Sequence, residues 1–293
     1  MKRIVTVQDI SAIGKCSLTV ALPIISSMGV ETAVIPTAVL STHTAFSGFT
    51  FHDLTSEIRP IADHWAAQQI SFDAIYTGYL GSFEQLHLVS DLIDRFGGGG
   101  CLTVIDPVMA DNGSLYPGFT PEFAAEMAKL CGKADVVVPN LTEACYMLGI
   151  PYPDGGKCTP DRARAIVKQL TSFGCPNAVL TGMSSEAGKL GILAYSAERE
   201  EYYSYENEHI PVSFHGTGDV FSSALVGGMM QDIGFYAALD IAVDYTVEAI
   251  RETVSDPDHR WYGVNFETAT PYLLSLLADK KADPAPKGKV FSL

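Results

Sequence analysis

The sequence His215-Gly216-Thr217-Gly218-Asp219 separates a polar, strand-like run over 202–212 from an apolar run over 220–230 that is typical of a buried helix. Two glycines allow the backbone to approach a ligand closely, and the first N–H groups of the following helix have no partner within it. With a carboxylate beside them, such N–H groups can hold a phosphoryl group next to a hydroxyl acceptor. The same residues would also suit a tight turn capped by Thr217 or Asp219, so the motif is weighed with the rest of the chain.

The strand, turn and helix around this motif belong to a pattern that runs along the whole chain. Short β-branched runs alternate with longer amphipathic runs, as in βαβ units on a mostly parallel sheet. We expect strands over residues 3–8, 32–39, 74–77, 102–105, 135–138, 178–181, 190–195 and 201–210. We expect helices over residues 16–28, 54–69, 83–96, 121–131, 142–148, 160–173, 219–230, 236–253 and 266–278. The pattern predicts one domain over 1–293 that ends in an extended tail over about 279–293, whose Lys-, Pro- and Ala-rich part resembles a linker.

Composition and charge exclude several classes of protein. The chain has 293 residues, of which 47% are hydrophobic and 18% charged, enough for a sizeable globular core. No apolar run approaches the roughly 18 residues of a membrane helix, and the first residues lack a signal-peptide core, so we expect a cytoplasmic protein with no membrane partner. A formal net charge of −15 without a Lys/Arg cluster argues against nucleic-acid binding. The six cysteines show no C-x-x-C spacing, which favours reduced thiols over disulfides or zinc ligands.

Polar residues follow the expected strands at their C-terminal ends, the edge at which an α/β sheet carries its ligand site. These segments are Gln8-Asp9, Thr77-Gly78-Tyr79-Leu80-Gly81-Ser82, Asp106-Pro107-Val108-Met109, Pro139-Asn140-Leu141-Thr142-Glu143, Thr181-Gly182 and the motif at 215–219. Any one of them could be an ordinary turn, and Asn140 with Glu143 would suit a helix capping box. Six in series at one edge favour a ligand site over six unrelated turns.

The order and spacing of four of these segments resemble the ribokinase-like superfamily and, within it, the pyridoxal (vitamin B6) kinases. They are Gly78-Tyr79-Leu80-Gly81, Asp106-Pro107-Val108-Met109, Pro139-Asn140-x-x-Glu143 and Gly216-Thr217-Gly218-Asp219. The segment 41–46, Ser-Thr-His-Thr-Ala-Phe, is similar to the lid of those kinases, as the last four residues are to their C-terminus. The resemblance implies a ribokinase-like α/β fold with a mostly parallel sheet flanked by helices on both faces, a small lid near residues 40–52, and a homodimer.

By this resemblance, the chain phosphorylates a hydroxymethyl group with ATP and Mg²⁺, and Asp219 is the catalytic base. An ordinary Asp has a pKa of about 3.9, far below that of an alcohol, so we expect Asp219 mainly to orient the hydroxyl whose proton leaves late. The backbone N–H groups of Gly216, Thr217 and Gly218 would stabilise charge on the γ-phosphoryl oxygens, aided by the helix dipole.

The resemblance also implies a metal and nucleotide site. Asp106 and Glu143 correspond to the acidic pair that holds Mg²⁺, through water molecules because Mg²⁺ keeps several of them. Asn140 would contact the nucleotide phosphates or that water shell. Thr181 stands where B6 kinases often have Lys or Thr, and a hydroxyl supplies no charge, so we expect strict metal dependence. A monovalent cation is a further candidate cofactor.

The substrate side of the site departs from the family pattern at Asp9, where many B6 kinases have a serine facing the pyridine ring. An Asp would accept a hydrogen bond from a protonated ring nitrogen or a ring hydroxyl, or it would cap the helix near Gly14. An aromatic wall and a hydroxyl group are expected to fix the ring. The substrate-binding residues implied by resemblance are Asp9, Ser11, Thr44, Phe46, Tyr79 and Asp219. His43 is either a lid contact or a packed loop residue, and we assign His215 no catalytic role.

The sequence therefore predicts a kinase of the 5'-hydroxymethyl group of pyridoxal, pyridoxamine or pyridoxine. A hydroxymethylpyrimidine kinase of thiamine synthesis is the alternative within the fold, since it shares the Asp-Pro-Val-Met and G-x-G-D signatures, but the 41–46 and 78–81 segments favour the B6 branch. A non-catalytic B6 or nucleotide sensor is the alternative of another class, and Asp219 argues against it. An adenosine or sugar kinase would predict more polar residues along the first strand and the lid.

Overall fold

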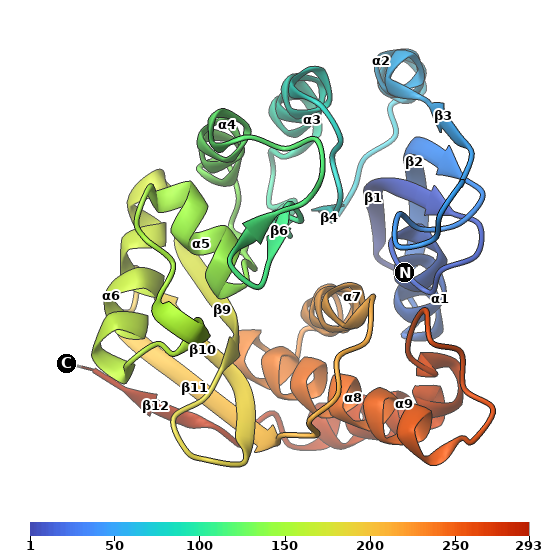
Figure 1. The fold of residues 1–293 in the computed structure, drawn as a ribbon. Coiled ribbons are helices and arrows are strands. Elements are labelled where there is room, and N and C mark those ends of the chain that lie inside the picture. The colour runs from blue at the N-terminus through green and yellow to red at the C-terminus, as the bar shows by residue number, and fades with distance from the viewer. Residues whose placement is uncertain (293) are drawn as a thin grey trace.

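The computed structural model describes residues 1–292, and strands of one sheet run through its centre (Figure 1). The sheet contains β1 (Arg3–Ser11), β2 (Glu31–Leu40), β3 (Phe51–Asp53), β4 (Ala74–Thr77), β5 (Leu102–Ile105), β8 (Val136–Val137), β9 (Asn177–Met183), β10 (Lys189–Ser196), β11 (Glu201–Glu208) and β12 (Lys289–Phe291). A small separate sheet pairs β6 (Ala110–Asp111) with β7 (Ser114–Leu115).

The ten strands of the main sheet follow the order β12-β11-β10-β9-β8-β5-β4-β1-β2-β3. Every pair from β2 through β9 is parallel, and antiparallel pairs add β3 at one edge and β10, β11 and β12 at the other. The chain turns from β1 outward to β2 and then returns to β4 on the other side of β1. This reversal places a topological switch point at the C-terminal ends of β1 and β4, where open α/β sheets bind ligands.

Helices cover both faces of the sheet. They are α1 (Leu18–Ser27), α2 (Thr55–Ala67), α3 (Phe83–Phe96), α4 (Pro121–Cys131), α5 (Leu141–Leu148), α6 (Pro160–Leu170), α7 (Thr217–Met229), α8 (Phe235–Ser255) and α9 (Phe266–Ala282). Helices α2 to α6 share one apolar core with Val5 and Val7 of β1, whereas α1, α7, α8 and α9 share the other with Ile4. Successive residues of a strand face opposite sides, so a strand buried on both faces needs a continuous apolar run.

The expected α/β class with a mostly parallel sheet is confirmed. The ranges 74–77, 102–105, 83–96 and 121–131 agree with β4, β5, α3 and α4, and the other expected elements are present with ends shifted by a few residues. The two Thr-Pro helix starts are capped as the sequence indicates, since Thr120 and Thr159 accept hydrogen bonds from the backbone N–H groups of Phe123 and Arg162, the third residues of their helices. All six cysteines are free, and five are buried. Within residues 1–292, no helix is long and apolar enough to span a membrane.

The segment over 279–292, expected as an extended tail, begins within the last turn of α9 and ends in β12. Helix α9 continues to Ala282, and β12 pairs antiparallel with β11, with the ring of Phe291 stacked 5.5 Å from that of Tyr202. The Lys-rich composition suggested a solvated linker, but Lys280 is buried and its Nζ lies 2.7 Å from Oδ2 of Asp240 on α8. Only tertiary packing brings this buried acid to the tail. Leu293 lies outside the described residues.

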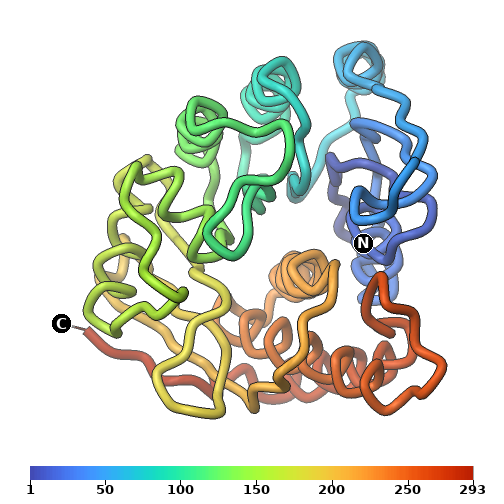
Figure 2. Tube along the Cα trace, in the orientation of Figure 1, coloured from blue at the N-terminus to red at the C-terminus, as the bar shows by residue number. Residues whose placement is uncertain are grey.

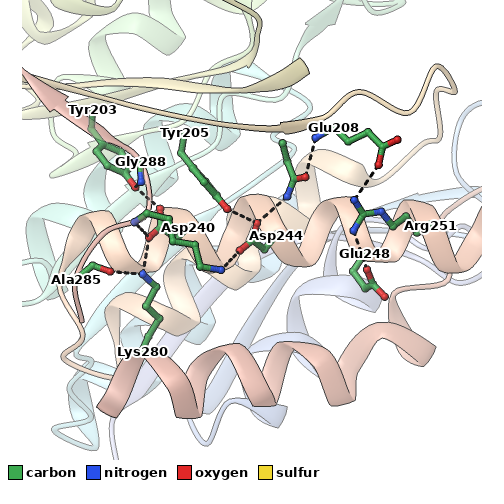
Figure 3. Close-up of polar contacts among 12 residues, drawn as sticks. Tyr203, Tyr205, Glu208, Asp240, Asp244, Glu248, Arg251, Lys280, Ala285 and Gly288 are labelled. Atoms are coloured by element: carbon green, nitrogen blue, oxygen red, sulfur yellow. Dashed lines mark hydrogen bonds and ion pairs between the residues drawn. The ribbon is translucent and has the colours of Figure 1, made fainter. Parts of the chain in front are cut away.

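A polar network fastens this C-terminal segment to α8 and β11 (Figure 3). Asp240 accepts hydrogen bonds from the Tyr203 hydroxyl and from the Lys287 backbone N–H, in addition to its ion pair with Lys280. Asp244, one helical turn further on, accepts from the hydroxyl of Tyr205 at 2.8 Å and pairs with Lys287. Buried carboxylates persist only when they are paired and hydrogen-bonded, and both of these are.

Candidate active site

The structure brings the polar strand-end segments to one edge of the sheet. Asp9 lies near the end of β1, Tyr79 follows β4, and Asp106 follows β5. Asn140 and Thr181 face each other through an isolated parallel bridge at the ends of β8 and β9. The motif at 215–219 leads into α7, and the charges of Asp106 and Asp9 both act on Asp219. Residues spread over two hundred positions thus meet at the predicted edge.

The motif at 215–219, the candidate phosphate turn, adopts the conformation that its glycines allow. Gly216 has φ of 83°, and α7 begins directly after it at Thr217. The Thr217 hydroxyl donates to the carbonyl of Phe214 at 3.4 Å, and no side chain of the described residues caps this helix. The capped-turn alternative is therefore not what the chain adopts. The free N–H groups at the start of α7 remain available to an anion.

The two glycines of this motif have different surroundings, and this predicts different effects of Gly→Ala substitutions. A Cβ on Gly216 would lie 2.1 Å from the carbonyl oxygen of Lys15, and the left-handed backbone adds strain. We expect Gly216→Ala to lower the free energy of unfolding by about 2–5 kcal/mol, measured by urea unfolding. A Cβ on Gly218 would meet no atom of the described residues within 4 Å.

Gly218→Ala is the matched control for the fold, and we expect its unfolding midpoint to equal that of the parent chain. If a phosphoryl group occupies the open space beside Gly218, the added methyl group should lower kcat/KM for phosphoryl transfer by about tenfold or more. A Gly218→Ala variant with undiminished kcat/KM would contradict this position for the phosphoryl group.

Asp219 differs from an ordinary aspartate. Its side chain is half-buried, and burial together with the nearby charge of Asp106 raises its pKa to about 8. The backbone N–H of Ser17 opposes this shift by hydrogen-bonding to the carboxylate. Ser17 itself has φ of 52°, an uncommon backbone conformation for a residue with a side chain. The ordinary pKa expected from sequence is thus wrong, because it ignored burial and neighbouring acids, and the raised value makes Asp219 a stronger base.

Asp106 and Glu143 are both buried and interact electrostatically. Burial raises the pKa of Asp106 to about 7, and burial with the charge of Asp106 raises the pKa of Glu143 well above its usual range. Ser222 on α7 donates its hydroxyl hydrogen to Oδ2 of Asp106 at 2.7 Å. Glu143 accepts from the backbone of Met109 and, in a capping box, of Asn140. The capping role anticipated for Asn140 and Glu143 is therefore real, and it fixes both side chains at the site.

A divalent cation fits the chemistry of this pair. Burial disfavours the charged form of both carboxyls and the charge of Asp106 adds to the effect on Glu143, so a cation would stabilise the ionised pair, and Mg²⁺ prefers such hard oxygen ligands. Within residues 1–292 no three His, Cys, Asp or Glu side chains form a closed metal cluster. A bound Mg²⁺ would accordingly take most of its ligands from water and nucleotide. Thr181 lies close by, with its hydroxyl turned toward the Pro139 carbonyl at 3.4 Å.

Asp9 is buried at an irregularity in the sheet. The pairing of β1 with β2 shifts between Gln8 and Ile10, opposite Pro36, whose nitrogen carries no hydrogen for the ladder. Ser11 donates its hydroxyl hydrogen to Oδ2 of Asp9 at 2.9 Å, and burial raises the pKa of Asp9. Two of the predicted substrate-binding residues are therefore in direct contact. Ser17, rather than Asp9, occupies the N-cap position of α1.

The three expected ring contacts lie in two groups. Thr44 is exposed and Phe46 half-buried in the loop that joins β2 to β3, whereas Tyr79 packs against Phe119 with ring centroids 5.6 Å apart. Tyr79 is nevertheless close enough to Asp9 for that charge to raise its pKa, together with burial. His43 is buried and its ring stacks 4.2 Å from that of the exposed His215, so His43 is a packed loop residue.

Several residues around the site carry no sequence signal. Ser17 reaches Asp219 through its backbone, which any residue type could do, and Ser222 is one of many small residues in α7. Trp261 and Tyr262 approach the 41–50 loop from the far end of the chain. The burial, contacts and separations that identify them exist only in the folded protein.

Comparison with known proteins agrees with this geometry. The family profile described as phosphomethylpyrimidine kinase matches residues 22–261. A Bacteroides thetaiotaomicron protein of that description, crystallised with pyridoxal, is 39% identical, with a TM-score of 0.87 over 93% of this chain and 95% of its own. Pyridoxal kinase from Lactobacillus plantarum is 29% identical, with a TM-score of 0.85 over 97% of this chain and 99% of its own. The Bordetella avium pyridoxine/pyridoxal/pyridoxamine kinase is 25% identical over 84% of each chain.

These similarities confirm the ribokinase-like fold expected from the spacing of the four motifs. The family profile matches more than half of the chain and ends well beyond the phosphate turn at 216–219. The chain therefore belongs to the phosphomethylpyrimidine kinase family.

Proposed function

We propose that the protein is an ATP-dependent kinase that phosphorylates the 5'-hydroxymethyl group of pyridoxal, pyridoxamine or pyridoxine. The observation that carries this proposal is Asp219, a carboxylate with a raised pKa beside the free N–H groups of α7. Such a pairing suits the transfer of a phosphoryl group to an alcohol. The pyridoxal-bound Bacteroides relative supports a B6 vitamer as the acceptor.

In the proposed reaction, Asp219 orients the substrate hydroxyl and accepts its proton as the new O–P bond forms. The N–H groups of Gly216, Thr217 and Gly218 stabilise the transferring phosphoryl group, and Thr181 and Asn140 would contact the nucleotide phosphates. Asp106 and Glu143 would hold Mg²⁺, which supplies positive charge to the phosphates when bound. A monovalent cation is a further proposed cofactor.

On the acceptor side, we propose that the vitamer ring lies between the group around Tyr79 and the loop that carries Thr44 and Phe46. Asp9, held by Ser11, would accept a hydrogen bond from the protonated ring nitrogen or a ring hydroxyl. We also propose a single kinase domain over 1–293, a homodimer by resemblance to the family, and a cytoplasmic location.

A hydroxymethylpyrimidine kinase remains the second candidate, since the matching family profile carries a pyrimidine-kinase description. The pyridoxal bound by the 39% identical relative and the two relatives named as B6 kinases favour the first candidate. A non-catalytic sensor is disfavoured, because it would need neither Asp219 nor the neighbouring acids at the phosphate turn.

An acceptor panel tests the proposal. With purified protein and Mg-ATP, we expect phosphorylation of pyridoxal, pyridoxamine or pyridoxine, measured by ADP release and mass of the product, and none of a simple sugar. Chelation of Mg²⁺ should abolish turnover and added Mg²⁺ should restore it. Thr181, unlike a lysine at this position, has no positive charge that could replace that of the metal. Phosphorylation of hydroxymethylpyrimidine alone would overturn the B6 assignment, and no turnover of any acceptor would favour the sensor.

A further inference from the structure

The loop between α8 and α9, residues 256–265, takes part in none of the roles assigned above. It carries Trp261, whose surface is 60% exposed although Trp is highly buried on average. Figures 1 and 2 show this orange-red loop rising beside the blue N-terminal part of the chain. An exposed indole next to the candidate lid requires an explanation.

Trp261 and Tyr262, in the middle of this loop, contact the candidate lid, the 41–50 loop. The ring of Trp261 lies 4.5 Å from that of Phe46, and the ring of Tyr262 lies 5.5 Å from it. Nδ1 of His43 accepts from the backbone N–H of Ala45 at 3.1 Å, so the ring hydrogen is on Nε2, which donates to the Tyr262 carbonyl at 3.1 Å. The loop therefore contacts both rings of the lid, His43 and Phe46.

The ends of the same loop are fixed to the body of the protein. The amide of Asn265 donates to Asp256 at 2.9 Å and closes the loop at its base. Lys15, one turn before α1, donates to the Val264 carbonyl and pairs with Glu267 at 2.8 Å. The loop is thus a fixed support against which the lid rests.

On its other side the loop reaches the segment before the phosphate turn. The ring of His259 lies 5.7 Å from that of Phe214, edge to face. Gly263 is packed so closely against Lys15 that a Cβ there would lie 2.5 Å from the Lys15 side chain. The backbone carbonyl of Lys15 also lies against Gly216. Lys15, in the turn before α1, therefore contacts both the 256–265 loop and the phosphate turn.

We propose that Trp261 is a positioning residue for the vitamer: it holds Phe46 and His43 over the substrate ring and loses its solvent exposure when the vitamer binds. The inference rests on the proposed function, because it takes the 41–50 loop as the substrate lid. The contacts of Trp261 are with lid residues, whereas His259 makes the contact on the phosphate side. Loss of the indole should therefore weaken the vitamer half of the site and spare the nucleotide half.

Steady-state kinetics with Trp261→Ala and the conservative Trp261→Phe test the positioning role. Removing an aromatic pair is expected to raise KM for the vitamer by about three- to tenfold. KM for Mg-ATP should change by less than about twofold, a split that general loosening of the fold would not produce. Trp261→Phe keeps a flat apolar ring and should restore KM for the vitamer to near the parent value.

Fluorescence supplies a readout that is independent of turnover. The chain has two tryptophans, and the other one, Trp65, packs against Phe72 beside the first residues of β1 and β2, whereas the 41–50 loop follows the opposite end of β2. In a Trp65→Phe background only Trp261 emits, and pyridoxine should shift its emission to the blue as the indole leaves water. Mg-ATP alone should cause no such shift.

The outcomes separate the two proposals. If vitamers are phosphorylated but Trp261→Ala leaves KM for the vitamer unchanged and pyridoxine leaves the emission unchanged, the positioning role is wrong and the proposed function stands. If the parent chain phosphorylates no vitamer, the proposed function fails and the role of Trp261 fails with it. An equal rise of KM for both substrates, without restoration by Trp261→Phe, would mean that Trp261 only stabilises the fold.

Discussion

Asp219→Asn is expected to lower kcat for the vitamer by about 10²–10⁴-fold, the usual contribution of a general base. The amide keeps the size of the side chain but cannot accept the proton, and Asp219 is the acidic residue in the first turn of α7. KM for the vitamer should change little, because orientation by hydrogen bonding is partly retained. Initial rates at saturating Mg-ATP measure the effect.

The pH dependence of the parent enzyme provides the control for this substitution. Protonated Asp219 cannot act as a base, so kcat/KM for the vitamer should rise with pH as the carboxyl loses its proton. Burial and Asp106 raise its pKa to about 8, and a cation bound beside Asp106 would move the rise to lower pH. Asp219→Asn should lack this ionisation. Turnover retained by Asp219→Asn with an unchanged pH profile would contradict the base assignment.

Lys280→Met is expected to cause the largest loss of stability, about 3–5 kcal/mol in the free energy of unfolding. Asp240 is fully buried, and its Oδ2 lies 2.7 Å from the Lys280 ammonium (Figure 3). Methionine preserves the apolar stem but leaves the Asp240 carboxylate without its buried partner, and an unpaired buried charge is costly. Urea unfolding followed by circular dichroism measures the change.

Lys287→Met is the matched control, because this lysine pairs with Asp244 but its own side chain is 45% exposed. Water can partly replace its ammonium group, so the loss should be clearly smaller than for Lys280→Met. Adding Asp240→Asn to Lys280→Met should recover part of the stability, since it removes the orphaned charge. A loss below about 1 kcal/mol in Lys280→Met would show that Asp240 does not depend on this ion pair.

Local patterns accounted for the elements and for where the polar segments fall. The segment Thr120-Pro121-Glu122 predicts the start of α4, and β5 is a short apolar run bounded by polar residues. The small strands β3, β6, β7 and β12 were missed, since two or three residues carry too little pattern to predict a strand. Their pairing partners, such as Tyr202 for Phe291, lie far away in the chain.

The local features of the candidate site could be predicted from the sequence, but its electrostatics and long-range contacts could not. The capping box of Asn140 and Glu143 spans three residues and could be predicted, as could the free helix start after Gly216. The pKa of Asp219 could not, because it depends on burial and on Asp106, which lies more than a hundred residues away. The contact of Trp261 with Phe46 could not be predicted either, because it joins opposite ends of the chain.

The sequence by itself determined the α/β class, the order of strands and helices, and the set of polar segments at the strand ends. These follow from hydrophobic periodicity, caps and glycine-rich turns, which act over a few residues. Only the tertiary structure decided that the Lys-rich tail is fastened to α8 through the buried Lys280, that Asp219 has a raised pKa, and that the 256–265 loop contacts the 41–50 loop. Burial and electrostatic interaction depend on distance in space, and residues far apart in the chain become neighbours only when it folds.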